Sequence, residues 1–480
     1  MKQLLLSFAL LLICSLAHSQ EALQHFLNNP ALRHAAIGVK VTCLRTGQHV
    51  VSHNADMSLT PASVLKLITS AVALETFGSD FRYETHVAFD ADDQTRILVI
   101  GSGDPTLGSD RLDDNPLQFF INTTHVLQNI LSADTQYSIY VVDNLFGYSG
   151  ISPGWTWLNI GMHYAQGSYG ISVFDNSFRA FFNTTDWNSR PRLLRMEPHI
   201  PGLTFQNELT LNRTGTNNGF IYAAPFDTHR ILRGDIPGGR AEVSIGGDIP
   251  DPGLLLGQTL ANHLAQANFS IGSVETARAD WITLLCPTNR TSPPYQIGRI
   301  LFTQQSRPMR DIVREVNVRS NNHFSEHLIR SLGRHVDPDI YAEPLPLGIE
   351  FIHTFFQERD MCTASLHLYD GSGLAPQNAV SATFINELLV YMRHGCARTE
   401  AFFHSLPRAG MDGTVASFLR GTPLAGRTWV KSGSIFGVQA FAGYILHGDT
   451  ELAFTILVNN FNGTRVQVRA AIEQFLVGMM

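Results

Sequence analysis

The chain has 480 residues, which is enough for more than one domain. Hydrophobic residues make up 44% of it and charged residues 16%, a composition typical of globular proteins rather than disordered ones. The net charge of −7 provides no basic surface, so nucleic acid is not expected as a partner. Beyond the amino-terminal region no apolar run reaches the length of a membrane helix. We therefore expect no integral membrane span once that region is removed.

The amino terminus has the pattern of an export signal. Lys2 precedes an apolar run from Leu4 to Cys14, and small residues follow just before Gln20. We interpret residues 1–19 as a signal peptide and expect the mature chain to be exported. Four cysteines follow, and none of them forms a C-x-x-C pair, so a zinc ribbon is not indicated. Disulfides and free thiols both remain open for these four residues, which are Cys43, Cys286, Cys362 and Cys396.

The first predicted elements are a short amphipathic helix at 21–32 and two paired strands at 36–44 and 49–53. A buried helix is then predicted to run to Phe77. Thr60 can cap this helix, Pro61 fits its first position and Gly78 can end it.

Ser63 and Lys66 lie three residues apart in this helix and would share one face. A serine hydroxyl becomes a nucleophile when a base takes its proton, and burial lowers the pKa of a lysine so that it can act as that base. Free N–H groups at the start of the helix suit an oxyanion. The S-x-x-K pattern alone is a weak signal, because an ordinary helix with a solvated lysine also fits it.

The middle of the chain has a different texture, with short strands and turns from about residue 81. Within it we predict helices at 116–131 and 254–267 and a buried strand at 137–142. Residues 287–294 are expected to be a crossing linker. Helical patterns then return at 309–318 and 325–332.

The end of the chain is a predicted meander of three strands followed by a helix, at 428–431, 438–446, 451–459 and 466–476. A sheet that begins early and is completed late implies a discontinuous domain. We therefore expect a catalytic domain formed by 20–80 and 287–480, with the middle of the chain inserted between them.

Two further motifs carry polar side chains suited to the same chemistry. Ser320 and Asn322 fit S-x-N between two helices, where a hydroxyl can relay a proton and an amide can hold a carbonyl. Lys431-Ser432-Gly433 fits K-[ST]-G on a late strand, where a cation and a hydroxyl can bind a carboxylate. The N–H of Ser434 would be a second oxyanion donor beside that of Ser63. Each triplet alone is weak evidence, since a polar helix connection or an edge-strand lysine also fits it.

The order S-x-x-K, S-x-N, K-[ST]-G is the set found in penicillin-binding proteins and class A β-lactamases. With it, the chain resembles the D-alanyl-D-alanine carboxypeptidase/endopeptidase family of class C low-molecular-mass penicillin-binding proteins, peptidase family S13. Other segments that resemble this family are Gly101–Leu107 (G-x-G-D-P-T-L), Pro153–Trp157, Asp370–Leu374, Gly410–Thr414 and Lys431–Gly443. The resemblance implies an α/β (α+β) transpeptidase/β-lactamase-like domain with two inserted β-rich domains. These would be 81–103 with 169–286, and 104–168.

The resemblance also implies a penicillin-sensitive, periplasmic serine-type D-Ala-D-Ala carboxypeptidase that acts on peptidoglycan stem peptides and cross-links through an acyl-enzyme. β-Lactam antibiotics would be covalent inhibitors, and no metal or organic cofactor is expected. Ser63 would be the nucleophile, Lys66 its base and Ser320 a proton relay. Asn322 would fix the substrate and Lys66, and Lys431–Gly433 would bind the terminal carboxylate.

Two departures from the family pattern stand out. The family's K-T-G is K-S-G here, which keeps the hydroxyl at Ser432. Where relatives often have an aspartate after Trp-x, this chain has Asn159. If that position contacts the amino group of the stem peptide's diamino acid, the lost charge changes substrate recognition there.

Three other functions compete with this interpretation. His323, Glu326 and His327 fit H-x-x-E-H, a zinc peptidase signature, although no third ligand stands at a telling spacing. A β-lactamase or esterase on the same fold would differ in fast release of the acyl group. A non-enzymatic scaffold is disfavoured because the residues of all three motifs are intact.

Overall fold

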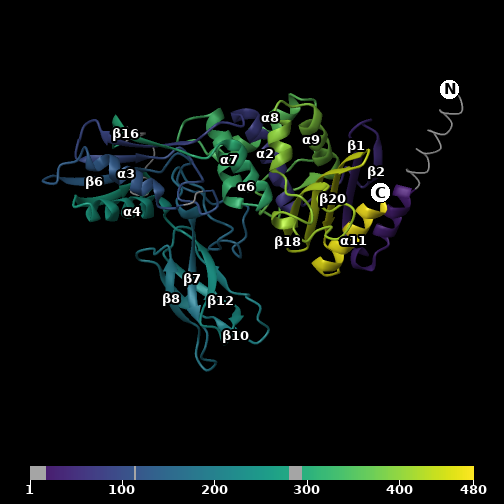
Figure 1. Cartoon of the computed structure of the whole chain (residues 1–480), viewed down its shortest axis with the longest axis horizontal. Helices are drawn as coiled ribbons and strands as arrows, with labels where there is room; N and C mark the ends of the chain where they lie inside the picture. The colour runs from purple at the N-terminus through teal and green to yellow at the C-terminus, as the bar shows by residue number, and fades with distance from the viewer. Residues whose placement is uncertain (1–17, 113–114, 280–293) are drawn as a thin grey trace. The chain divides into compact units, whose positions relative to one another are not determined.

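The computed structural model describes residues 18–112, 115–279 and 294–480 (Figure 1). These residues form two compact units. The first unit contains 18–80, 309–321 and 349–480, and the second contains the described parts of 81–308 together with 322–348. Nearly all of the expected signal peptide and of the expected linker at 287–294 lies outside the described residues. Among the described helices, none has both the length and the apolar character that crossing a bilayer requires.

The first unit is built on an antiparallel sheet with the strand order β18-β19-β20-β1-β2. The register joins the two ends of the chain, since Ala36 lies opposite Asn459 and Cys43 opposite Leu452. The predicted early hairpin and late meander are therefore one sheet. Its strands are β1 (Ala36–Cys43), β2 (His49–His53), β18 (Thr428–Ile435), β19 (Val438–His447) and β20 (Thr450–Asn459).

Helices cover both faces of this sheet. On one face the amino-terminal helix, residues 18–27, packs with α11 (Arg465–Gly478), and the rings of Phe26 and Phe475 stack with centroids 5.3 Å apart. On the other face Asn386 of α9 donates its side-chain amide to the carbonyl of Ala453 in β20. The remaining elements of this unit are η1 (Pro30–Leu32), β3 (Ser58–Leu59), η2 (Ala62–Leu65), α2 (Lys66–Phe77), α6 (Met309–Val318), β17 (Val380–Ser381), α9 (Ala382–His394), α10 (Thr399–Ser405) and η4 (Gly413–Val415). Helix α8 (Pro344–Gln357) begins in the second unit and ends in the first.

The predicted helix that carries Ser63 starts differently from the expectation. It opens with the 3₁₀ turn η2, and α2 follows from Lys66. Pro61 occupies the N-cap position without a side-chain cap, and the Thr60 hydroxyl donates to the carbonyl of Pro376 instead. Gly78 ends the helix, as predicted, with φ at 86°.

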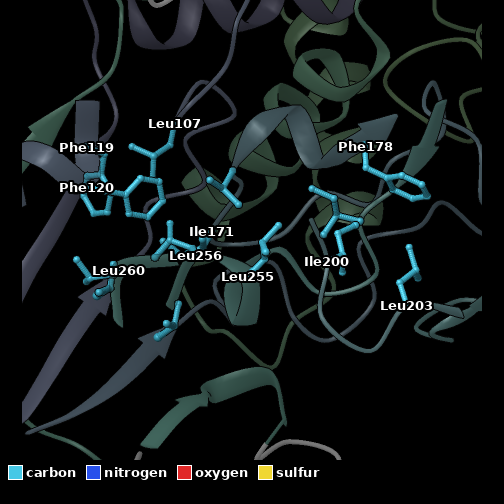
Figure 2. Close-up of a cluster of buried hydrophobic side chains, with 14 of the residues drawn as sticks. Leu107, Phe119, Phe120, Ile171, Phe178, Ile200, Leu203, Leu255, Leu256 and Leu260 are labelled. Atoms are coloured by element: carbon cyan, nitrogen blue, oxygen red, sulfur yellow. The ribbon is translucent and has the colours of Figure 1, made fainter. Parts of the chain in front are cut away.

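The second unit contains a mixed sheet with the strand order β15-β6-β5-β4-β16. Phe119 and Phe120 of α3 and Leu256 and Leu260 of α4 pack into its hydrophobic core (Figure 2). Leu107 of the G-x-G-D-P-T-L segment joins the same core, so this segment has a packing role. The elements are β4 (Glu84–Asp90), β5 (Arg96–Ile100), α3 (Gln118–Gln128), β6 (Gln136–Val142), α4 (Pro252–Gln266), β15 (Ser270–Thr276), β16 (Ile297–Gln305) and α7 (Asn322–Val336).

Smaller sheets fill the rest of the second unit, in line with the short β-like runs of the sequence. They have the orders β14-β7-β8, β11-β12-β9 and β10-β13. The elements are η3 (Phe174–Asn176), β7 (Ser177–Asn183), β8 (Arg192–Glu197), β9 (Thr204–Asn207), β10 (Thr210–Asn212), β11 (Phe220–Tyr222), β12 (His229–Arg233), β13 (Asp235–Pro237) and β14 (Val243–Asp248).

The units do not divide at the boundary expected from the sequence. Strand β16 pairs with β4, so residues up to 308 group with the second unit although the expected catalytic domain resumes at 287. Residues 322–348, which contain all of α7, also group with the second unit. The finer division of the insert into two domains stays a prediction.

Candidate active site

Ser63 and Lys66 touch across one turn. Ser63 lies in η2 and is partly exposed, whereas Lys66 is the first residue of α2 and is fully buried. Lys66 Nζ lies 3.0 Å from Ser63 Oγ and donates to the main-chain carbonyl of Ser372 at 2.6 Å. A hydroxyl and an amine at this distance can exchange a proton directly.

Lys431 and Ser320 form a second lysine–serine pair in the same unit. Lys431 Nζ donates to Ser320 Oγ at 3.0 Å and to the carbonyl of Ser432 at 2.7 Å. Burial, with a smaller contribution from Lys66, lowers the pKa of Lys431 well below its usual value, so the uncharged amine is favoured. Ser320 follows α6 with φ at +60°, a strained conformation of the kind that clusters at functional sites.

Gly433 brings β18 close to the turn that carries the serine. A Cβ atom at this position would lie 2.5 Å from the carbonyl oxygen of Pro61 and 3.0 Å from the amide nitrogen of Ser63. Only glycine leaves room for this approach. The next residue, Ser434, is exposed and lines the same cavity as Ser63.

The serines of the site line one cavity of about 380 Å³. Ser63, Ser320, Ser432 and Ser434 all line it, so each of the three sequence motifs contributes a serine to one opening within the first unit. Lys66 and Lys431 are buried. Lys66 contacts Ser63, and Lys431 contacts Ser320.

Two contributors to the site were not assigned a role from the sequence. The carbonyl of Ser372 accepts from Lys66, and Thr414 Oγ1 lies 2.9 Å from Ser432 Oγ at the edge of the cavity. Both belong to segments that carried the family resemblance, Asp370–Leu374 and Gly410–Thr414. The family resemblance thus covered both residues. The residue types alone did not predict that the carbonyl of Ser372 accepts from Lys66 or that Thr414 contacts Ser432.

Asn322 and Asn159 belong to the second unit, where Tyr164 links them. Asn322 Nδ2 donates to the main-chain carbonyl of Tyr164 at 2.7 Å, and the Tyr164 hydroxyl donates to Asn159 Oδ1 at 3.4 Å. Asn322 follows Ser320 by two positions in the chain. The expected contacts of Asn322 with Lys66 and of Asn159 with substrate stay predictions.

The H-x-x-E-H segment packs inside the second unit. His327 uses both ring nitrogens, with Nδ1 2.9 Å from the carbonyl of His323 and Nε2 2.7 Å from the hydroxyl of Ser172. Glu326 forms a buried ion pair with Arg330 at 2.8 Å. Within the described residues, no group of three or more His, Cys, Asp or Glu side chains is arranged to hold a metal ion. The geometry therefore assigns this segment to packing of α7. The described cysteines at 43, 362 and 396 are free thiols.

These contacts define a class of enzyme. A serine hydroxyl beside a buried amine, a second serine held by another lysine, and a strand edge passing the first serine are the parts of a serine–lysine acyltransferase. Comparison with known proteins identifies the family within this class.

A sequence profile of the D-Ala-D-Ala carboxypeptidase 3 (S13) family matches residues 19–478. The D-alanyl-D-alanine carboxypeptidase of Actinomadura sp. (strain R39) is 26% identical over 471 residues, which cover 93% of this chain and 82% of that protein. Penicillin binding protein 4 from Haemophilus influenzae has a similar structure, with a TM-score of 0.76, 18% identity and coverage of 95% of this chain and 97% of that chain. The same protein complexed with a β-lactam gives a TM-score of 0.72 at 16% identity, with the same coverage.

The chain belongs to the D-Ala-D-Ala carboxypeptidase 3 (S13) family. Its fold is that of penicillin binding protein 4, a mixture of helices and several sheets. The family and the fold class predicted from the motifs are thus confirmed, and the chain is a serine hydrolase of the carboxypeptidase type.

Proposed function

We propose that this chain is an exported, periplasmic D,D-carboxypeptidase and endopeptidase of peptidoglycan that acts through an ester on Ser63. Its substrates would be stem peptides that end in D-Ala-D-Ala and the cross-links made from them. One observation carries the proposal: Lys66 Nζ lies 3.0 Å from Ser63 Oγ at a cavity that Ser320, Ser432 and Ser434 also line.

Acylation begins with transfer of the Ser63 proton to Lys66. An amine accepts a proton only in its neutral form, which burial favours. Ser63 Oγ then attacks the carbonyl carbon of the penultimate D-Ala. The main-chain N–H groups of Ser63 and Ser434 donate to the oxyanion that forms, which is a large source of rate enhancement in such reactions.

The tetrahedral intermediate collapses when the leaving amine receives a proton. Ser320 is proposed to relay to it the proton that Lys66 took from Ser63, so that both groups return to their starting forms, and Lys431 holds the Ser320 hydroxyl at 3.0 Å. Lys431 and Ser432 bind the terminal carboxylate, and Gly433 lets the substrate backbone approach β18. Asn322 and Asn159 are proposed to position the acyl side of the substrate. Water then hydrolyses the ester and frees Ser63.

β-Lactams are proposed as covalent inhibitors because Ser63 can attack the carbonyl of their ring amide. The ring nitrogen stays attached to the acyl group after the ring opens, so no leaving group departs and water has no room to reach the ester. The Haemophilus influenzae relative, which shares this fold, has been solved with a β-lactam. A β-lactamase on the same fold would release its acyl group quickly, so the lifetime of the penicilloyl ester distinguishes the two functions.

Replacing Ser63 with alanine tests the proposal. Ser63→Ala should abolish covalent labelling by a fluorescent penicillin and the release of D-Ala from muropeptides, measured by mass spectrometry, because the ester forms on this hydroxyl. The matched control is Ser58→Ala, which removes an exposed hydroxyl five residues away and should keep both activities. Labelling of Ser63→Ala at the same site would contradict the proposal.

A further inference from the structure

The cavity at Ser63 has a basic wall that lies outside the three sequence motifs. Arg465 and Arg469 of α11 line this cavity together with Ser63 and Ser432. The two arginines are four residues apart, so they lie on one face of the helix. The helix start is fixed by a capping box, in which Thr464 Oγ1 accepts from the amide of Gln467 and Gln467 Oε1 accepts from the amide of Thr464.

The two guanidinium groups differ in their contacts. Arg469 donates to the hydroxyl of Ser417 at 2.9 Å and lies 3.7 Å from the carboxylate of Glu473. Arg465 is exposed and forms no ion pair with any residue that the structure describes. It is therefore a permanent cation at the cavity whose charge no described neighbour neutralises.

The lysine of the K-S-G motif is poorly suited to supply that charge. Lys431 is fully buried, and its amine already donates to Ser320 and to the carbonyl of Ser432. Burial, together with the second amine of Lys66, favours its neutral form. A peptide that enters with a free carboxylate thus meets on β18 a hydroxyl and a buried amine that already donates to Ser320 and Ser432, whereas Arg465 on α11 presents an exposed positive charge.

We propose that Arg465 and Arg469 are specificity residues that select substrates carrying a free carboxylate on the residue after the scissile bond. Arginine suits this role because its planar fork of donors matches a carboxylate and it stays charged at any working pH. The arginines would attract the carboxylate into the cavity and hold it against Ser432, and they take no part in proton transfer. This inference rests on the proposed acyl-transfer function of Ser63.

Paired substrates test the inference. An acylated D-Ala-D-Ala peptide and its carboxamide differ only in the terminal charge. Arg465→Gln should raise KM for the acid about 5-fold or more, as expected for the loss of one charged contact, while kcat stays within about 2-fold. KM for the carboxamide should not change. Arg465→Lys should restore part of the affinity for the acid, and added salt should weaken binding of the acid more in the wild type than in Arg465→Gln.

Arg420→Gln is the matched control, since it removes an exposed arginine of the same unit that does not line the cavity. It should leave both KM values unchanged. Because Arg469 also contacts Ser417 and Glu473, the single change at Arg465 decides the result, and Arg465→Gln/Arg469→Gln should enlarge the effect.

Equal changes for acid and carboxamide, or no change for either, would overturn the inference. Labelling of each variant at saturating penicillin reports an intact site, and a wild-type chain that never forms the ester on Ser63 would overturn the proposed function instead.

Discussion

Gly433 stands at the closest approach between the strand and the turn of the site. A methyl group there would meet three main-chain atoms, the oxygen of Pro61 and the nitrogens of Ser63 and Val64, and none of them can move without shifting η2. We predict that Gly433→Ala lowers the rate of penicillin acylation at least tenfold and destabilises the first unit by about 1–3 kcal/mol, the usual cost of overpacking. Stopped-flow acylation and denaturant unfolding measure the two effects.

Gly448→Ala separates the two consequences. Gly448 lies in the turn between β19 and β20 with φ at 60°, and no described atom lies within 4 Å of the position that a methyl group would take. Alanine there should cost about 1 kcal/mol through backbone strain and leave the acylation rate unchanged. If Gly433→Ala acylates as fast as Gly448→Ala, the close approach of β18 has no catalytic importance.

At the residue scale, the sequence indicated side chains but not main-chain acceptors. The spacing of Ser63 and Lys66 predicted their contact because residues three apart share a helix face. The acceptor for Lys66 is the main-chain carbonyl of Ser372. Every residue type has such a carbonyl, so the sequence does not predict which one accepts. Arg465 was not predicted for a related reason, since an exposed arginine at a helix start is common and its neighbours come from strands that are distant in sequence.

The loop that supplies this acceptor is held by one carboxylate. Asp370 is fully buried and accepts from the amides of Gly373 and Ala375 at 2.7 and 2.6 Å and from the side chain of Asn378 at 2.8 Å. We predict that Asp370→Asn costs about 2–4 kcal/mol, because one amide N–H would then face another N–H. Thermal unfolding measures this loss. Slower penicillin acylation should accompany it, since the carbonyl of Ser372 would no longer be fixed against Lys66.

Asp360→Asn is the comparison for this change. Asp360 is exposed and has φ at 57°, a conformation that asparagine tolerates well. It should change neither the unfolding temperature nor the acylation rate. An Asp370→Asn protein that unfolds and acylates like the wild type would show that the loop is held by other contacts.

At the element scale, periodicity predicted strands better than helix starts. The three strands of the late meander were predicted because alternating apolar residues identify half-buried strands, and in the structure they pair in chain order as β18, β19 and β20. The start of the Ser63 helix was wrong in detail, since proline at 61 fits a first helical position whether the first turn is 3₁₀ or α. No element was predicted between 333 and 427, where α8, α9 and α10 lie, although neither α9 nor α10 contains a glycine or a proline.

At the scale of the whole molecule, the pairing of β1 with β20 makes the first unit depend on both ends of the chain. The sequence predicted this closure because the early hairpin alone cannot bury a face. It did not predict that α7 would group with the second unit, since α7 follows Ser320 directly and the S-x-N motif placed both residues in one expected domain. The motif therefore spans the boundary between the units.

The histidines of α7 should make the second unit sensitive to acid. His323 and His327 are fully buried, and burial lowers the pKa of His327 to about 3 and that of His323 well below its usual value. The unfolded chain binds these protons below about pH 6.5 while the folded chain does not, so stability is lost as pH falls from about 6.5 toward 3. The loss should approach about 1.4 kcal/mol per pH unit for each histidine. Denaturant unfolding at several pH values, followed by tryptophan fluorescence, measures this slope.

His323→Phe isolates one of the two groups. Neither ring nitrogen of His323 has a hydrogen-bond partner among the described residues, and its ring lies 4.3 Å from that of His327, so phenylalanine keeps the ring contact and removes the titration. The variant should be at least as stable as the wild type at pH 5 and should show about half of the acid slope. His125→Gln, an exposed change on α3 in the same unit, should keep the full slope. An unchanged slope in His323→Phe would mean that acid unfolding of this unit begins at other groups, and that the buried pair is tolerated in its charged form.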